Sequence, residues 1–230
     1  MKKIPVVVLF VISACSNSKQ ISHSNSPAPQ NIAVAGKIYA TIYQQKAAEY
    51  RALCLQAFNI ARLRVDVNSQ TASVRAKAII TDIDETILDN SAYEVHQTLQ
   101  GKDYESSSWY DWTAMANADT VPGAPAFLKY AASKGITIFY VTNREEKERA
   151  GTLLNLQKFN LPNADNAHLI MKQGTSSKEI RRQQVTNTND VILLLGDNLA
   201  DFSSMFDKKR LMNAGKIQMS LLPYSEKNLL

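Results

Sequence analysis

The chain has 230 residues, enough for one sizeable core but not comfortably for two full domains, so we expect a single domain. Hydrophobic residues make up 45% and charged residues 20%, an ordinary composition that predicts a folded chain beyond the N-terminal segment. The formal net charge of +5 is too mild for a nucleic-acid-binding surface and suits a small anionic substrate. We therefore expect no nucleic-acid polymer as a partner.

Residues 1–14 have the pattern of a signal peptide. Lys2 and Lys3 precede a short apolar stretch, Ile4–Ile12, which is too short to span a bilayer as a mature helix. The letters ISAC end at Cys15 and resemble the bacterial lipobox, in which the cysteine becomes the first residue after cleavage and is lipidated. The alternative is an ordinary signal peptide followed by a chance cysteine. We expect an exported protein that a lipid on Cys15 anchors to a membrane.

Residues 15–34 form the expected flexible tether. Ser16 to about Pro29 is rich in Ser, Asn, Pro and Gln, which cannot bury enough apolar surface to become ordered. The only other cysteine is Cys54, so no intrachain disulfide can form if Cys15 carries lipid. Cys54 lies within the helical pattern AAEYRALCLQAFNIA, where we expect a small buried hydrophobe.

Residues 35–230 alternate between helical and strand patterns. Apolar residues recur at spacings of three and four from Ala35 to Val65, which predicts one long amphipathic helix, or two in series, outside the core. Continuous apolar runs predict strands buried on both faces at Ala76–Thr81, Ile136–Val141, His168–Met171 and Val191–Leu195. Helical patterns separate them at Ala124–Ser133, Glu145–Phe159 and Ser177–Val185. This alternation predicts an α/β fold, a Rossmann-like parallel sheet flanked by helices.

Every predicted strand ends in, or leads to, polar residues. In chain order these are Asp82 and Asp84, then Thr142-Asn143-Arg144, then Ser177-Lys178, then Gly196-Asp197-Asn198. In open α/β sheets the ligand crevice lies outside the carboxyl ends of the strands. We therefore expect these four groups to converge on one site.

The acidic residues of this site predict a metal. Asp82 and Asp84 are two apart, so they point to the same side if the strand continues that far. Two adjacent carboxylates repel each other unless a cation lies between them, and Asp197 would add a third. An all-oxygen, mostly carboxylate site is what Mg²⁺ prefers, whereas three histidines and no paired thiols do not favour zinc or copper.

Lys178 is a separate clue. Ser176 to Glu179 has the pattern of a helix start, with Ser176 as the N-cap and Glu179 closing a capping box. A lysine in the first turn opposes the helix dipole at a cost of roughly 0.3–1 kcal/mol. Such a residue is expected where a cation is needed for function, although an exposed lysine at this position is also common.

Taken together, these residues resemble a known family. Asp82-Ile83-Asp84-Glu85-Thr86, Thr142, Lys178 and Gly196-Asp197-Asn198-Leu199-Ala200-Asp201 are similar, in order and spacing, to the four motifs of the haloacid dehalogenase (HAD) superfamily. The stretches DIDETILDNSAY and ILLLGDNLADF resemble the two signatures of class C non-specific acid phosphatases, bacterial surface lipoproteins that also act as 5′-nucleotidases. The resemblance covers roughly Ala35 to Phe202.

The resemblance implies a role for each motif residue. Asp82 would attack the phosphoryl group to form an aspartyl-phosphate, and Asp84 would protonate the departing oxygen and then activate water. Mg²⁺ would be held by Asp82, Asp197 and the backbone carbonyl of Asp84, with Asp201 next to the ligands. Phosphoryl oxygens would be bound by Thr142, Asn143 and Lys178.

Residues 90–121 form a polar and aromatic insertion where the superfamily places its cap, which we expect to be mainly helical. Trp109 and Trp112 are three apart and share a face if they lie on a helix. They either pack the insertion onto the core or stack on a nucleobase of the substrate.

Four further polar residues are expected to be structural. For Glu85 and Asp89 we expect a helix-capping role. For His96 and His168 we expect only a structural one.

The C-terminal segment departs from the family pattern. Relatives continue into a strand that ends in an LPNPxYGxWE-like segment with a substrate-side aromatic, whereas this chain has Ile217–Leu222 followed by Pro223-Tyr224. The leading hypothesis is a magnesium-dependent acid phosphatase of phosphomonoesters, including nucleoside 5′-monophosphates. The alternative is a surface binding lipoprotein on the same fold with weak or no turnover. The resemblance favours the outer membrane, and a homodimer is compatible with it.

Overall fold

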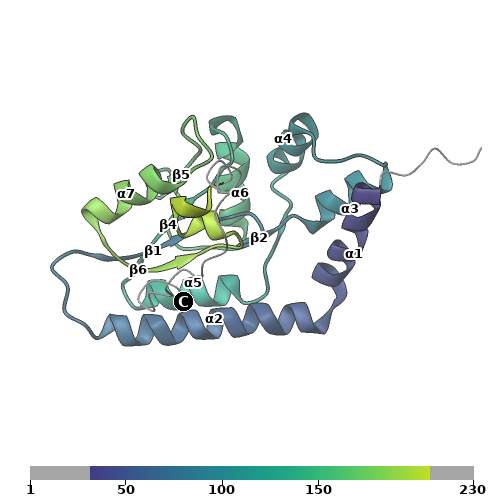
Figure 1. Ribbon diagram of the computed structural model, residues 1–230. Helices are drawn as coiled ribbons and strands as arrows, with labels where there is room; N and C mark the ends of the chain where they lie inside the picture. The colour runs from purple at the N-terminus through teal and green to yellow at the C-terminus, as the bar shows by residue number, and fades with distance from the viewer. Residues whose placement is uncertain (1–31, 208–230) are drawn as a thin grey trace, which may run out of the picture. The chain divides into compact units, whose positions relative to one another are not determined.

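Four parallel strands form the central sheet of the molecule (Figure 1). The structure, a computed structural model, describes residues 32–207. The strands are β1 (Lys77–Thr81), β4 (Thr137–Val141), β5 (Leu169–Ile170) and β6 (Asp190–Leu195), in the order β5-β4-β1-β6. The predicted parallel α/β sheet and its four strands are therefore confirmed.

The central strand β1 is buried on both faces, as its continuous apolar run predicted. Ile79 belongs to the larger core cluster, whereas its neighbours Ala78 and Ile80 belong to a second cluster on the other face. Strand β6 differs, because only Leu193 in it is buried and the rest of the strand is half-buried. Among the described residues β6 is an edge strand, so only one side of it pairs with a neighbour.

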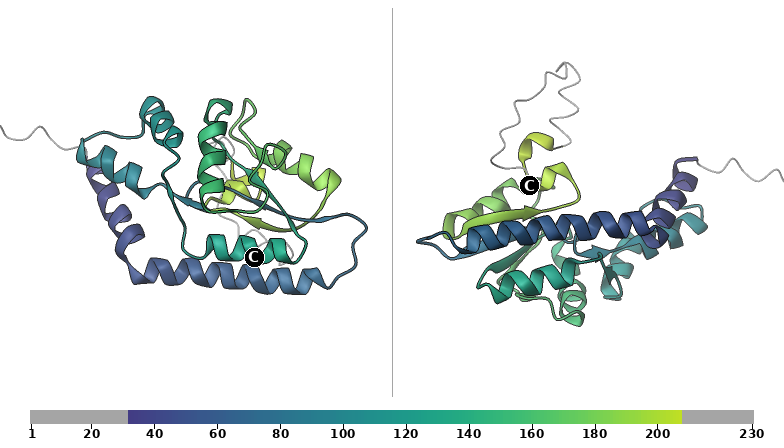
Figure 2. Two further views of the ribbon diagram at one scale, coloured as in Figure 1. Left: turned by 180° about the vertical axis from the view of Figure 1, so that it is seen from behind. Right: turned by 90° about the horizontal axis from the view of Figure 1, so that it is seen from below.

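Helices cover both faces of the sheet (Figures 1 and 2). On one face α2 (Ala48–Ser69), α5 (Ala124–Ser133) and α6 (Arg149–Lys158) contribute to the larger cluster, and α5 has the bounds that its pattern predicted. On the other face α7 (Glu179–Thr188) contributes Val185 to the smaller cluster. The parallel sheet is thus shielded from water on both sides, as such sheets require.

The N-terminal helical pattern forms two helices in series. Helix α1 (Ile32–Lys46) ends before Ala47, whose extended backbone separates it from α2. Helix α2 packs along α5, while Gln44 and Gln45 of α1 donate hydrogen bonds to Asp89 and Ser91 at 3.0 and 3.1 Å. The α1 helix therefore supports the segment that follows the first strand. Cys54 in α2 is half-buried against the core, less buried than expected.

The insertion begins and ends in a two-stranded antiparallel ribbon. Its strands are β2 (Leu88–Asp89) and β3 (Asp119–Thr120), and between them lie α3 (Ser91–Leu99) and α4 (Ser106–Ala114). The insertion is mainly helical, as expected. The ribbon holds its two ends together beside the sheet.

Two predicted helix starts are wrong in detail. Helix α7 begins at Glu179 with Lys178 as its N-cap, so Ser176 is not the cap. Glu179 closes no capping box, because its carboxylate accepts hydrogen bonds from Arg182 and Gln183 instead. The helix predicted from Glu145 starts as a short 3-10 helix, η1 (Glu146–Glu148), and continues as α6.

Several expectations lie outside the described residues. These are the signal peptide at residues 1–14, lipidation at Cys15, most of the 15–34 tether, and the C-terminal segment Ile217–Leu222 with Pro223-Tyr224. Within residues 32–207, no helix is both long and apolar enough to cross a membrane.

Candidate active site

Asp82 follows β1 directly and lies at the centre of the site. Its backbone N–H donates to the carbonyl of Leu195 at 2.9 Å, which joins the ends of β1 and β6. The residue is 7% exposed, and its carboxylate accepts a hydrogen bond from the ammonium of Lys178. Burial raises the pKa of the Asp82 carboxyl to about 7, against the attraction of Lys178. Repulsion from Asp84 and Asp201 adds to this rise in pKa.

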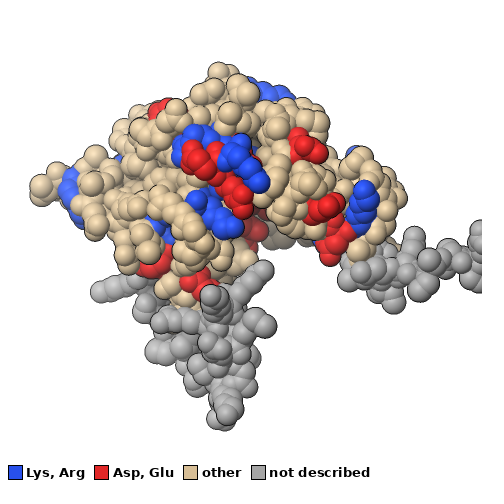
Figure 3. Space-filling view, turned by 90° about the horizontal axis from the view of Figure 1, so that it is seen from above, with Lys and Arg blue, Asp and Glu red and all other residues tan. Residues whose placement is uncertain are grey.

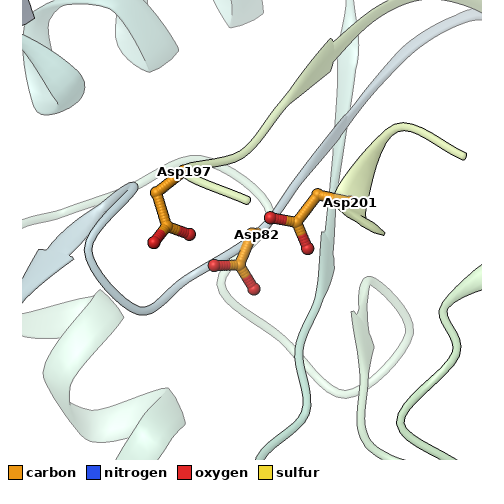
Figure 4. Close-up of side chains that lie close together, drawn as sticks. All are labelled: Asp82, Asp197 and Asp201. Atoms are coloured by element: carbon orange, nitrogen blue, oxygen red, sulfur yellow. The ribbon is translucent and has the colours of Figure 1, made fainter. Parts of the chain in front are cut away.

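Three carboxylates meet at the ends of β1 and β6. Oxygens of Asp82, Asp197 and Asp201 lie within 4.8 Å of one another, and the three side chains converge in Figure 4. The Asp197 side chain is more exposed than the other two, yet partial burial and repulsion from Asp201 raise the pKa of its carboxyl. This donor set consists of hard oxygen atoms only, so it fits a divalent cation such as Mg²⁺.

Asp201 lies within this carboxylate group, although the sequence placed it only next to the ligands. It ends the short 3-10 helix η2 (Leu199–Asp201), and its Oδ2 accepts the backbone N–H of Asn198 at 3.0 Å. A Cβ atom at Gly196 would lie 2.4 Å from the Cβ of Asp201. Only glycine therefore allows the backbone after β6 to pass this close to Asp201.

Lys178 lies between two of the carboxylates. It is 5% exposed, and its Nζ forms ion pairs with Asp82 and, at 2.7 Å, with Asp201. The sequence left open whether this lysine was functional or merely exposed, and its burial and contacts exclude the second alternative. Its unfavourable position at the start of α7 is offset by two nearby negative charges.

Thr142 and Asn143 follow β4 and lie next to Arg181 of α7. The Thr142 side chain is fully buried, and its hydroxyl accepts the backbone N–H of Arg144 at 3.1 Å. Within residues 32–207 its hydroxyl donates to no acceptor, so its proton can be donated to a ligand. Arg181 donates to the carbonyl of Thr142 and, at 2.7 Å, to the exposed Asn143 side chain, which fixes the backbone of this loop.

Asp84 lies beyond the end of β1, two residues after Asp82. Strand β1 ends at Thr81, so the alternation of a strand no longer applies when the chain reaches Asp84. Its carboxylate instead accepts hydrogen bonds from Arg144 at 2.7 Å and from Asn90 at 2.9 Å. The condition for the two side chains to share one side, a strand that continues to Asp84, is therefore not met.

Three buried arginines support the site, and two of them, Arg181 and Arg182, were not singled out from the sequence. Besides Arg144 and Arg181, Arg182 donates to the backbone carbonyls of Ala200 and Asp201 at 3.0 and 2.8 Å. In α7, Arg181 and Arg182 are buried while Ile180 is 62% exposed, the reverse of an ordinary amphipathic helix. The local sequence gives no signal that these two arginines are buried, because arginine is usually exposed.

The two tryptophans of α4 have different surroundings. Trp109 packs edge-on against Tyr93, with ring centroids 5.1 Å apart, and the guanidinium of Arg144 lies 5.7 Å from its ring centre. The indole N–H of Trp112 donates to Asn90 at 2.9 Å, and its ring packs against the main core. Trp112 therefore holds the insertion onto the core, whereas Trp109 lies beside an arginine that contacts Asp84. A cavity of about 350 Å³ lies between α3 and α4, lined by Ala92, Tyr93, His96, Ser108, Asp111, Trp112 and Met115.

The four residues expected to be structural have local hydrogen-bond partners. Glu85 accepts the backbone N–H of Asn90 at 3.0 Å and Asp89 that of Ser91 at 2.8 Å, which confirms the capping role at the start of α3. Burial, with repulsion from Asp84, raises the pKa of Glu85 to about 8. The rings of the two histidines hydrogen-bond to local partners, namely His96 to Gln100 and His168 to Asp165.

Basic and acidic side chains lie side by side on the face shown in Figure 3. Glu145 pairs with Lys147 at 3.5 Å and with Lys172 at 3.8 Å, and Arg149 pairs with Glu146 at 2.5 Å. In these pairs, charges of the two signs therefore compensate each other locally.

Comparison with known proteins agrees with this geometry. Residues 9–223 match the family described as HAD superfamily, subfamily IIIB (acid phosphatase). Two solved structures of a class C acid phosphatase from Bacillus anthracis are similar to this chain. The one with tungstate bound has a TM-score of 0.73, and the other has 0.74. Each is 34% identical in sequence, over 80% of this chain and 79% of the other.

Proposed function

The chain belongs to the subfamily IIIB acid phosphatases of the HAD superfamily and is a phosphoric monoester hydrolase, and from this premise we propose that it works through an aspartyl-phosphate on Asp82 with Mg²⁺ as its cofactor. The contact between Lys178 and Asp82 carries the proposal. It places a buried cation against the proposed nucleophile, from a segment 96 residues away in the chain. Family membership supports turnover over the alternative of a binding lipoprotein.

In the first step a carboxylate oxygen of Asp82 attacks phosphorus and the bond between phosphorus and the ester oxygen breaks. Asp84 gives its proton to the departing oxygen, so a neutral alcohol leaves. In the second step Asp84 takes a proton from a water molecule that attacks phosphorus, and the carboxylate of Asp82 is released with inorganic phosphate. Lys178 and the hydroxyl of Thr142 bind the phosphoryl oxygens during both steps.

Asp82 and Asp197, with the backbone carbonyl of Asp84, would hold Mg²⁺, since all three supply hard oxygen donors. When bound, the ion supplies positive charge beside the phosphoryl oxygens. Asp201 keeps Lys178 in place and faces Asp82 from the other side. Asn143 would bind phosphate through its amide nitrogen, because Arg181 occupies only its side-chain oxygen.

We propose nucleoside 5′-monophosphates among the substrates. The related Bacillus anthracis enzyme was solved with tungstate, a tetrahedral oxyanion like phosphate. Trp109 supports a base-binding role, because it is half-buried on the insertion and lies beside Arg144. Trp112 is less suited to stacking, since its ring packs against the core and its N–H is bound.

We also propose that the enzyme is exported and anchored to the outer membrane through lipid on Cys15. This rests on the lipobox-like ISAC segment and the polar stretch after it, both of which precede the described residues. A homodimer remains compatible with the proposal.

The test of the proposed chemistry is Asp82→Asn, which removes the nucleophile and nearly preserves its volume. Purified wild-type and variant protein are assayed on p-nitrophenyl phosphate with Mg²⁺ and with a chelator. We expect turnover by the wild type to require Mg²⁺ and turnover by the folded variant to be abolished. Substantial activity of the variant would exclude the aspartyl-phosphate, and undiminished wild-type activity in chelator would exclude the metal.

A further inference from the structure

The carboxylate of Asp84 is held by two side chains from different parts of the fold. Arg144, after β4, donates from Nε to both carboxylate oxygens at 3.1 and 3.2 Å, and from Nη2 to Oδ1 at 2.7 Å. Asn90, before α3, donates from Nδ2 to Oδ1 at 2.9 Å. Donors from both directions leave the carboxylate little freedom to rotate.

The orientation of the Asn90 amide is set by Trp112. An indole N–H can only donate, so the amide atom that faces Trp112, 2.9 Å from Nε1, must be the oxygen Oδ1. The amide nitrogen then faces Asp84. The backbone N–H of Asn90 donates to Glu85, and the residue is 1% exposed. The amide is therefore fixed in the one orientation that donates to Asp84.

Arg144 is fixed in the same way. It is 2% exposed, and its Nη1 donates to the hydroxyl of Thr152 on α6 at 3.1 Å. That hydroxyl donates in turn to the carbonyl of Glu148 at 2.8 Å. The backbone N–H of Arg144 donates to the hydroxyl of Thr142. The guanidinium is therefore held by α6 and by the loop after β4.

We propose that Asn90, Trp112 and Arg144 are positioning residues that hold the carboxylate of Asp84 for proton exchange with the departing oxygen. This inference rests on the proposed function, in which Asp84 is the acid and base. A proton donor must lie within hydrogen-bond reach of the atom that it protonates, and a misplacement of about 1 Å can cost about 10²-fold in rate. Because Trp112 belongs to α4, the insertion takes part in the chemistry as well as in covering the substrate.

The leaving group of the substrate provides the test. Phenyl phosphate and p-nitrophenyl phosphate are similar in shape, but p-nitrophenolate leaves easily without a proton and phenolate does not. Trp112→Phe keeps a ring and removes the N–H that orients Asn90. We expect kcat/KM to fall by about 5–20-fold for phenyl phosphate, the effect of one lost hydrogen bond. The loss for p-nitrophenyl phosphate should stay below about threefold, because that substrate depends little on the acid.

A second variant changes Asn90, the residue that accepts the hydrogen bond from Trp112. Asn90→Asp still accepts from Trp112 but turns a carboxylate, instead of an amide donor, towards Asp84. We expect a loss of about 10²-fold for phenyl phosphate, again larger than for p-nitrophenyl phosphate. Thermal unfolding shows whether this variant folds, and Trp112→Phe alone decides the matter if it does not.

The matched control is Tyr110→Phe on the same helix. Its hydroxyl donates to Glu145 at 3.1 Å and not to the Asp84 network, so the ratio of the two kcat/KM values should stay at the wild-type level. Equal losses for both substrates in Trp112→Phe, or no loss for either, would overturn the inference. Asp84→Asn distinguishes a failure of the proposed function from a failure of the positioning role alone. If it keeps wild-type turnover, the proposed function fails. If it is inactive while Trp112→Phe keeps the wild-type ratio, only the positioning role fails.

Discussion

Lys178 is the residue on which we expect both the stability and the proposed chemistry of the site to depend. It lies against Asp82 and Asp201 and is almost fully buried. Its removal leaves two buried carboxylates facing each other without a cation. Breaking a buried ion pair from one side typically costs about 3–5 kcal/mol, because the remaining charge is uncompensated.

We predict that Lys178→Met lowers the free energy of unfolding of metal-free protein by about 3–5 kcal/mol. In the presence of Mg²⁺ it should lower kcat by about 10²–10³-fold, the usual effect of losing one group that stabilises transition-state charge. Urea unfolding and phosphatase assays measure these effects. Lys172→Met is the control: this lysine is partly exposed and 3.8 Å from Glu145, so its loss should change stability by less than about 0.5 kcal/mol. Unchanged stability of Lys178→Met would contradict the buried pair.

Trp109 is expected to act on substrate choice. A base stacked on its ring gains roughly 1–3 kcal/mol, so Trp109→Ala should lower kcat/KM for a nucleoside monophosphate by about one to two decades. A small ester without a base should lose much less, because every catalytic group lies outside α4. Steady-state kinetics on both substrates measure this difference, and thermal unfolding checks that the variant is folded. Equal losses for the two substrates would mean that Trp109 only packs against Tyr93.

At the level of elements, the loop after β6 depends on a close approach that a single side-chain atom would block. The atoms of Asp201 nearest to an added Cβ at Gly196 include its own Cβ, which cannot move without its backbone. The loop carries Asp197 at one end and Asp201 at the other. Any displacement therefore separates the carboxylates that face Asp82.

Gly196→Ala should therefore destabilise the protein by about 1–3 kcal/mol, as overpacking does, and weaken Mg²⁺ binding. Thermal unfolding with and without Mg²⁺ measures both effects. Gly36→Ala makes the same substitution in α1, where no atom lies within 4 Å of the added Cβ. That variant should be more stable than wild type by about 0.5–1 kcal/mol, because alanine favours a helix over glycine. If the two variants behaved alike, the close approach at Gly196 would not be real.

For the whole molecule, anchoring and catalysis are expected to be separable. Cys15→Ser should move the protein out of the membrane fraction, because a single acyl chain binds only marginally and the lipidated cysteine supplies nearly all of the attachment. Specific activity of the purified protein should not change, since all the proposed catalytic residues lie within residues 82–201. Cell fractionation with an activity assay tests this. Recovery of the variant in the membrane fraction at the wild-type level would contradict the lipid anchor.

Much of this protein could be predicted from its sequence. The four buried strands, the helices between them and the convergence of polar strand ends follow from patterns that lie within a few residues of each other. Asp82, Lys178 and Asp197 each follow a strand or begin a helix, so the order of elements alone brings them to one edge of the sheet. Local periodicity was enough because it reflects backbone hydrogen bonding and the burial of one face.

The tertiary structure decided the direction and the partners of the side chains. The carboxylate of Asp84 binds Arg144, 60 residues away, and Lys178 is the N-cap of α7 in place of Ser176. No local pattern indicates that Arg181 and Arg182 are buried or that Trp112 orients Asn90. These contacts join segments far apart in the chain, and a buried polar group takes whichever partner the packing of those segments brings within reach. The sequence by itself therefore determined the elements and the edge of the sheet where they meet, while the packing decided which side chains bind one another there.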